Sequence, residues 1–109
     1  MPRIVLVATI EVRLAARAAF HAFERQAAAI MESHGGRIER TVTILPESGA
    51  DTFREVHVVT FPSEDAYAAY RADPRLAALA PLRESAVVAT TVLTGTDGPD
   101  YHFPGGSTV

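Results

Sequence analysis

The sequence predicts an α+β fold in which four strands form an antiparallel sheet and helices cover one face of it. Four segments rich in β-branched residues alternate in side-chain character, as strands do. Between the first and second segments, and between the third and fourth, apolar residues recur at helical spacing instead. The order strand, helix, strand, strand, helix, strand places two crossovers around a hairpin, and right-handed crossovers then give the expected sheet.

The N-terminal third should hold one strand and one long helix. A strand is expected at residues 3–12, where both alternate sets of side chains are apolar in the middle, so both faces should be covered. A helix is expected over residues 14–34, because one apolar stripe follows its length. That stripe consists of Phe20, Phe23, Ala27, Ile30, Met31 and His34. Gly35 and Gly36 should end the helix, since glycine takes the left-handed C-terminal conformation without steric cost.

The middle of the chain predicts a hairpin. Strands are expected at residues 37–45 and 53–61, joined by the turn sequence PESGAD. In the third strand, Val56 and Val58 share one face. The opposite face carries Phe53, Glu55, His57, Val59 and Phe61.

The second half predicts helices and a last strand. Ser63 is a good N-cap for a helix that runs to about Ala72. Asp73 and Pro74 should cap and start another short helix, because proline is favoured at the first helical position. The last strand is expected at residues 86–94.

This arrangement is ferredoxin-like βαββαβ, with residues 3–12 and 53–61 as the two central strands. We expect one domain at residues 1–95 and an irregular tail at residues 96–109, rich in glycine and proline. Helices cover only one face, yet the first and last strands are apolar on both. The bare face therefore predicts a homodimer whose two sheets pack together.

Composition excludes several classes of function. The chain has no cysteine, so it has neither disulfides nor thiolate metal sites. All ten basic residues are scattered arginines and the net charge is −3, so we expect no nucleic-acid partner. The first apolar run is too short to span a membrane and lacks a cleavage site, so we expect no membrane partner and a cytoplasmic location.

Two runs carry a resemblance to a known family: TFPSEDAYAAYRADPRLAAL at residues 60–79 and HGGRIE at residues 34–39. They resemble the dimeric α+β barrel superfamily, in particular a small branch of domains of unknown function related to antibiotic biosynthesis monooxygenase-like proteins. The resemblance covers residues 3–95 and implies a pocket between sheet and helices. The superfamily includes cofactor-free monooxygenases, polyketide cyclases, muconolactone isomerases and haem-handling enzymes. The chain departs from the monooxygenase pattern because it has no tryptophan.

His57 is the candidate catalytic residue. A histidine held by a carboxylate can act as a general base near neutral pH. Its side chain is expected to share a layer with Thr9 or Glu11 and with Thr41 or Glu39. The alternative is that His57 lies in the dimer interface, hydrogen-bonded to a threonine or a carboxylate.

Four further residues are candidates for substrate binding: Tyr67, Tyr70, Thr9 and Glu39. The two tyrosines are three residues apart and share a helix face, where they could line an apolar pocket. The alternative is that they are core aromatics with their hydroxyls at the rim. Glu39, with Glu11 and Glu55, could equally belong to a structural ion network with nearby arginines.

These features predict a cofactor-independent enzyme of secondary metabolism, namely a cyclase, isomerase or oxygenase that acts on a small apolar or aromatic molecule. We expect little charge on the helix-facing side of its pocket, no cofactor and no metal. The alternative is a non-catalytic ligand-binding or accessory protein, which the lack of a nucleophile motif or phosphate loop favours.

Overall fold

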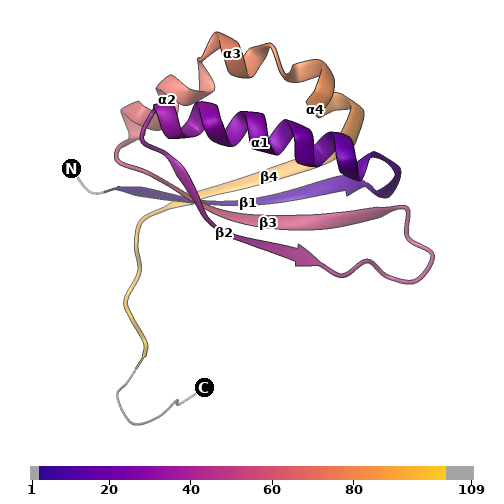
Figure 1. Cartoon of the computed structure of the whole chain (residues 1–109). Helices are drawn as coiled ribbons and strands as arrows, with labels where there is room; N and C mark the ends of the chain where they lie inside the picture. The colour runs from indigo at the N-terminus through magenta and orange to yellow at the C-terminus, as the bar shows by residue number, and fades with distance from the viewer. Residues whose placement is uncertain (1–2, 103–109) are drawn as a thin grey trace.

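The computed structural model describes residues 3–102, and its centre is a four-stranded antiparallel sheet (Figure 1). The strands are β1 (Ile4–Arg13), β2 (Arg37–Ile44), β3 (Thr52–Phe61) and β4 (Val87–Gly95). Their order is β2-β3-β1-β4, and every pairing is antiparallel. The predicted fold class and the two predicted central strands are therefore confirmed.

The helices all lie against the same face of this sheet in the described part of the chain (Figure 1). They are a 3₁₀ turn η1 (Leu14–Ala16), α1 (Arg17–Ser33), α2 (Glu64–Arg71), α3 (Pro74–Ala77) and α4 (Ala80–Ala86). The helix expected from residue 14 thus begins as a 3₁₀ turn. The single short helix expected after Pro74 is two helices, because Pro81 occupies the first turn of α4 and its ring favours a helix start over a helix interior.

Local side-chain chemistry explains where α2 and α3 begin. The Ser63 hydroxyl accepts a hydrogen bond from the backbone N–H of Ala66 at 3.1 Å, as an N-cap does. The Asp73 carboxylate accepts one from the backbone N–H of Arg75 at 2.8 Å. Both predicted caps are confirmed.

The core between sheet and helices consists of two clusters of buried apolar side chains. One lies around Val12, Phe20, Phe53 and Ala86. The other contains Ile4, Leu6, Met31, Val59 and Phe61. Predicted stripe residues of α1 supply both clusters, because the helix runs along the length of the sheet (Figure 1).

The opposite face of the sheet, here called the open face, carries side chains that alternate with the core. The strand register places Val7 of β1 beside Val58 of β3 and Leu93 of β4 on this face. Leu93 is 66% exposed and Val7 is 37% exposed. Val42 and Ile44 of β2 extend the same apolar surface.

The segment after β4 leaves the sheet on the side of the open face (Figure 1). Residues 96–102 contain no helix or strand. Arg3 holds the start of this segment, since its guanidinium donates to Asp97 at 2.7 and 2.9 Å. The predicted tail extends beyond residue 102, and that part, including Phe103, lies outside the described residues. No helix found in the described part is both long and apolar enough to cross a membrane.

Candidate functional site

A cavity of about 150 Å³ lies between the sheet and the helices. It lies between the two core clusters, because Ile10 and Phe23 of one cluster and Met31 and Phe61 of the other line it. Its rim reaches the exposed β4 residue Val92. The lining is mostly apolar, but the polar side chains of Glu24, His57, Tyr67, Tyr70, Arg83 and Thr90 also line it. The expectation of little charge on this side is therefore wrong, because α1 and α4 each contribute a charged residue.

His57 lies on the helix-facing side of β3 and is only 4% exposed. The register pairs it with Ala8 of β1 and Thr41 of β2. Thr41 was expected in this layer, whereas Ala8 replaces the expected Thr9 or Glu11. The expectation that His57 lies in a sheet-to-sheet interface is corrected, because alternation along β3 points this side chain toward the helices.

A buried carboxylate holds the His57 imidazole. Nε2 of His57 lies 2.8 Å from Oε1 of Glu55, two residues earlier on the same face of β3. An ionised carboxylate only accepts hydrogen bonds, so Nε2 must donate here. In the neutral imidazole, Nδ1 then carries the free lone pair. Nδ1 is the atom that could take a proton from a bound molecule.

Glu24 of α1 faces that free nitrogen. Its Oε2 lies 3.7 Å from Nδ1 of His57, and the Glu24 side chain is 20% exposed. Burial raises the pKa of the Glu24 carboxyl, and the negative charge of Glu55 adds to the rise, while His57 and Arg83 oppose it. A carboxyl group with a raised pKa can hold a proton in the range where general acids work.

The Glu55 carboxylate has a second histidine beside it. Nε2 of His21 lies 3.6 Å from Oε2 of Glu55, and the His21 side chain is 44% exposed. Residues from α1 and β3 therefore form a continuous group of Glu24, His57, Glu55 and His21. This group joins the cavity to the surface.

Tyr67 and Tyr70 both line the cavity, and both also pack on the core. Their ring centroids lie 5.2 and 5.5 Å from that of Phe61. Burial raises the pKa of the Tyr70 phenol to about 12, and Glu24 contributes to the rise. The Tyr70 hydroxyl therefore remains a hydrogen-bond donor throughout the physiological range.

Arg83 brings a positive charge to the lining from α4. Its guanidinium donates to the hydroxyl of Thr90 on β4 at 2.7 Å, and this bond holds the half-buried side chain in place. Its charge also lowers the pKa values of Glu24 and Tyr70 against the effect of burial. Arg83 is thus near enough to both side chains to interact with a molecule between them.

Sequence reasoning missed Glu24 and Arg83. A signal for Glu24 was present: it lies four residues after Phe20 and three before Ala27, so it falls on the apolar stripe of α1. A carboxylate on a buried stripe needs a partner, and His57 is that partner. For Arg83, no comparable signal exists, because the rotation of the short helix α4 decides which way it points.

The structure does not bring Thr9 and Glu39 together with His57. Thr9 pairs with Val56 and so lies on the open face. Glu39 lies at an irregularity in the β2–β3 pairing and accepts a hydrogen bond from the Thr60 hydroxyl at 3.0 Å. Neither lines the cavity, because each points to the other side of the sheet. Glu39 instead forms an ion pair with Arg3 at 3.4 Å, in line with the ion-network alternative.

No three or more His, Cys, Asp or Glu side chains of residues 3–102 are grouped so that they could hold a metal ion. The polar groups at the cavity are therefore described by their hydrogen bonds and charges alone.

The sheet order and the one-sided helices define a ferredoxin-like α+β protein, and solved structures share this fold. A protein of unknown function from Rhodopseudomonas palustris has a TM-score of 0.74 at 17% identity, covering 91% of this chain and 85% of that one. A mutant of SnoaB, a cofactor-independent oxygenase from Streptomyces nogalater, has a TM-score of 0.65 at 16% identity. The match covers 92% of this chain and 97% of SnoaB. A proposed antibiotic biosynthesis monooxygenase from Caulobacter crescentus has a TM-score of 0.66 at 16% identity. The match covers 90% of this chain and 92% of that protein.

The family follows from the sequence match. The chain belongs to the DUF1330 family, a domain of unknown function, whose model matches residues 6–96. None of the curated proteins matches the chain. The resemblance to a domain-of-unknown-function branch near the antibiotic biosynthesis monooxygenases is thereby confirmed.

Proposed function

We propose that the protein is a cofactor-independent enzyme of small-molecule metabolism, in which His57 is the acid/base residue. The observation that carries the proposal is a buried histidine that lines a mostly apolar cavity, with Nε2 held by Glu55 and Nδ1 3.7 Å from Glu24. Tyr67 and Tyr70 would position the substrate from α2. The similarity in fold to a cofactor-independent oxygenase supports this class of chemistry. Such a metabolic role predicts a cytoplasmic protein.

The proposed substrate is a small, mostly apolar or aromatic molecule. A cavity of about 150 Å³ has room for a molecule of the size of benzene. Its apolar walls would bind the body of the ligand, and the polar side chains would fix its orientation.

The proposed assembly is a homodimer formed through the open face. Support comes from the apolar side chains of Val7, Val42, Ile44 and Leu93, which are 37–66% exposed on this face. Burying such a surface is favourable, and a two-fold axis lets one patch cover its copy. The cavity lies on the other side of the sheet and would stay accessible.

A cavity-filling substitution tests ligand binding. Ala8 lies on β1 beside His57 and lines the cavity, so Ala8→Leu should fill part of it. We expect phenol, benzoate and cyclohexanone to shift the amide NMR signals of β1 and β3 in the original chain but not in Ala8→Leu. The matched control is Ala69→Leu on the exposed side of α2. If none of the three molecules shifts these signals, or if Ala8→Leu binds them equally well, the cavity is not a binding site.

Catalysis is tested on a substrate from the natural source. Native mass spectrometry of the protein purified from its own host would report a retained molecule and its mass. We expect His57→Gln to abolish turnover of that molecule while leaving binding intact. Unchanged turnover would remove His57 from the mechanism.

A non-catalytic ligand-binding role is the second candidate. The hydrogen bond between His57 and Glu55 favours this role, because each of these buried polar side chains then has a hydrogen-bond partner within the protein. A structural role is therefore enough to explain the pair. In that case the retained molecule would be released unchanged, and His57→Gln would alter stability alone.

A further inference from the structure

Two of the polar side chains that line the cavity, Glu24 and His57, can each bind and release a proton. Glu24 and His57 come from different elements, α1 and β3, yet their facing atoms are 3.7 Å apart. That separation is too long for a direct hydrogen bond. It is close to hydrogen-bond range, so a small shift of either side chain would let a proton pass directly between them.

The lining of the cavity also contains a positive charge. Arg83 is anchored to Thr90 at 2.7 Å, and the lining combines it with Glu24, His57 and the Tyr70 hydroxyl. A guanidinium has several N–H donors and no acceptor, so it favours a ligand oxygen that is negative or becomes negative. Two proton carriers and one cation around an apolar space suit the formation and collapse of an enolate.

We infer that Glu24 is a second proton-transfer residue, which works with His57 while Arg83 binds the substrate oxygen, and that the substrate class is a small ketone with an acidic neighbouring C–H. This inference rests on the proposed function, and it narrows the reaction to a proton-transfer isomerisation. Glu55 is a positioning residue, because it acts only through the imidazole it holds.

The reaction is balanced without any oxidant or cofactor. Nδ1 of His57 takes the proton from the carbon beside the carbonyl, and the C–H electron pair becomes a C=C bond. The carbonyl electrons move to the oxygen, where Arg83 stabilises the enolate. In a ketone with a β,γ-double bond this enolate is a conjugated dienolate. Protonated Glu24 then gives its proton to the γ-carbon, while the oxygen electrons re-form the C=O bond and the remaining C=C bond moves next to it. The proton left on His57 returns to Glu24, which restores both groups.

Two further features favour this division of roles. Burial raises the pKa of the Glu24 carboxyl, which favours the protonated form that the second step uses. Glu24 of α1 and Glu55 of β3 lie beside the His57 ring, His21 of α1 lies beside Glu55, and Arg83 of α4 lines the same cavity. Of these, Glu24 faces the free nitrogen, whereas Glu55 already occupies the other one.

The test uses the full chain with cyclohex-3-en-1-one as the probe, a monocyclic ketone that fits the cavity volume. Binding is followed by amide NMR shifts, and isomerisation to cyclohex-2-en-1-one by the ultraviolet absorbance of the conjugated product. We expect the original chain to bind and isomerise the probe. Glu24→Gln should bind it but isomerise it about 100-fold more slowly, the typical contribution of one acid/base group.

Matched variants make the result specific. Glu32→Gln changes an exposed carboxylate on the same helix and should leave the rate unchanged. Glu24→Asp keeps the charge but withdraws the carboxyl from His57, and should give an intermediate rate even if Glu24→Gln folds poorly. Arg83→Met should weaken probe binding and slow the reaction.

The outcomes separate this inference from the proposed function. Binding without isomerisation, or an undiminished rate in Glu24→Gln, overturns the inference and leaves the binding cavity in place. Failure of the ketone to bind, while phenol or benzoate still binds, overturns the ketone substrate class alone. Failure of every ligand in the Ala8→Leu experiment removes the proposed function as well.

Discussion

At the scale of single residues, Glu24 is unfavourable for stability in its charged form. Its carboxyl lies among apolar side chains of α1, where burial disfavours the charged form and raises its pKa. The folded protein therefore binds this proton more readily than the unfolded chain does. The fold tolerates the unfavourable charge because His57 and Arg83 offset part of it.

The first prediction concerns the stability of Glu24→Gln. The pKa of this carboxyl is higher in the folded protein than in the unfolded chain. Its charge therefore destabilises the fold at a pH above the folded-state pKa, and this effect vanishes at a pH below the unfolded-state pKa. The uncharged glutamine should therefore raise the unfolding midpoint at pH 8, and the gain should disappear as the pH falls below about 4. Thermal unfolding across this range measures it. A loss of stability at pH 8 would mean that the favourable interactions of the Glu24 carboxylate outweigh the cost of its burial.

Gly36 is constrained by packing rather than by its backbone angle. A Cβ atom at this position would collide with the ring of Phe61 and would lie 2.7 Å from Cγ of Met31. The Phe61 ring cannot easily move, because Tyr67 and Tyr70 pack against it.

The second prediction follows from that crowding. Gly36→Ala should destabilise the protein by about 1–3 kcal/mol, the usual cost of overpacking a core. Urea unfolding measures the change. The control is Gly98→Ala, where the added methyl group meets open space. Equal stability of the two variants would show that the Phe61 ring adjusts freely.

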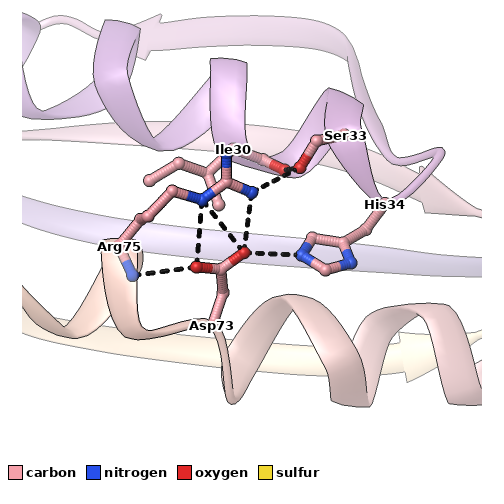
Figure 2. Close-up of polar contacts among 5 residues, drawn as sticks. All are labelled: Ile30, Ser33, His34, Asp73 and Arg75. Carbon is pink, nitrogen blue, oxygen red and sulfur yellow. Dashed lines mark hydrogen bonds and ion pairs between the residues drawn. The ribbon is translucent and has the colours of Figure 1, made fainter.

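At the scale of the elements, a polar cluster joins the end of α1 to the start of α3 (Figure 2). The Asp73 carboxylate accepts from the Arg75 guanidinium at 2.8 Å and lies 2.8 Å from Nε2 of His34. Arg75 also donates to the Ser33 hydroxyl at 2.8 Å, so the α3 residue reaches back to α1. His34, the last member of the stripe predicted for α1, thus has a direct polar partner for its ring.

The third prediction concerns this cluster and acid. Hydrogen bonds from the Arg75 guanidinium, from His34 and from the Arg75 backbone N–H lower the pKa of the Asp73 carboxyl well below its usual range. The stabilisation is fully present when the pH is above the pKa that Asp73 has in the unfolded chain. It is lost as the pH falls toward the lower pKa that Asp73 has in the folded protein. Asp73→Asn should therefore be less stable at pH 7, and its stability should fall less steeply below pH 4.

Acid unfolding followed by circular dichroism checks this prediction. Asp51→Asn, in the exposed loop before β3, is the control and should keep the steep acid dependence of the original chain. An equally steep curve for Asp73→Asn would mean that other carboxylates, such as Asp97 beside Arg3, set the acid sensitivity.

At the scale of the whole molecule, the sheet separates two surfaces of different character. The helix-facing side encloses the cavity, and the open face presents apolar side chains that no described element covers (Figure 1). Because side chains alternate along each strand, every strand contributes to both surfaces. A change on the open face can therefore alter assembly without touching the cavity.

The fourth prediction tests assembly. Leu93→Glu places a charge at the most exposed apolar position of β4. In a dimer with a two-fold axis through the open face, the two introduced carboxylates would be buried close to each other. We expect light scattering after size-exclusion chromatography to report a dimer for the original chain and a monomer for this variant. Ala69→Glu, on the exposed side of α2, should remain dimeric. A monomer for the original chain would refute the proposed interface.

The sequence by itself determined the order of the elements, the central strands and the fact that His57 and Glu55 share one face of β3. These properties repeat with the local period of strand or helix, so neighbouring residues are enough to reveal them. Residues 14–34 even contained the signal for Glu24, since a carboxylate interrupts the apolar stripe there.

Only the tertiary structure decided which residues meet at the cavity. The pairing of His57 with Ala8 instead of Thr9 depends on strand register, and a shift of one residue reverses the face. The approach of Glu24 and Arg83 depends on how α1 and α4 are rotated over the sheet. Register and rotation are set by packing between segments distant in sequence, and local periodicity contains no information about them.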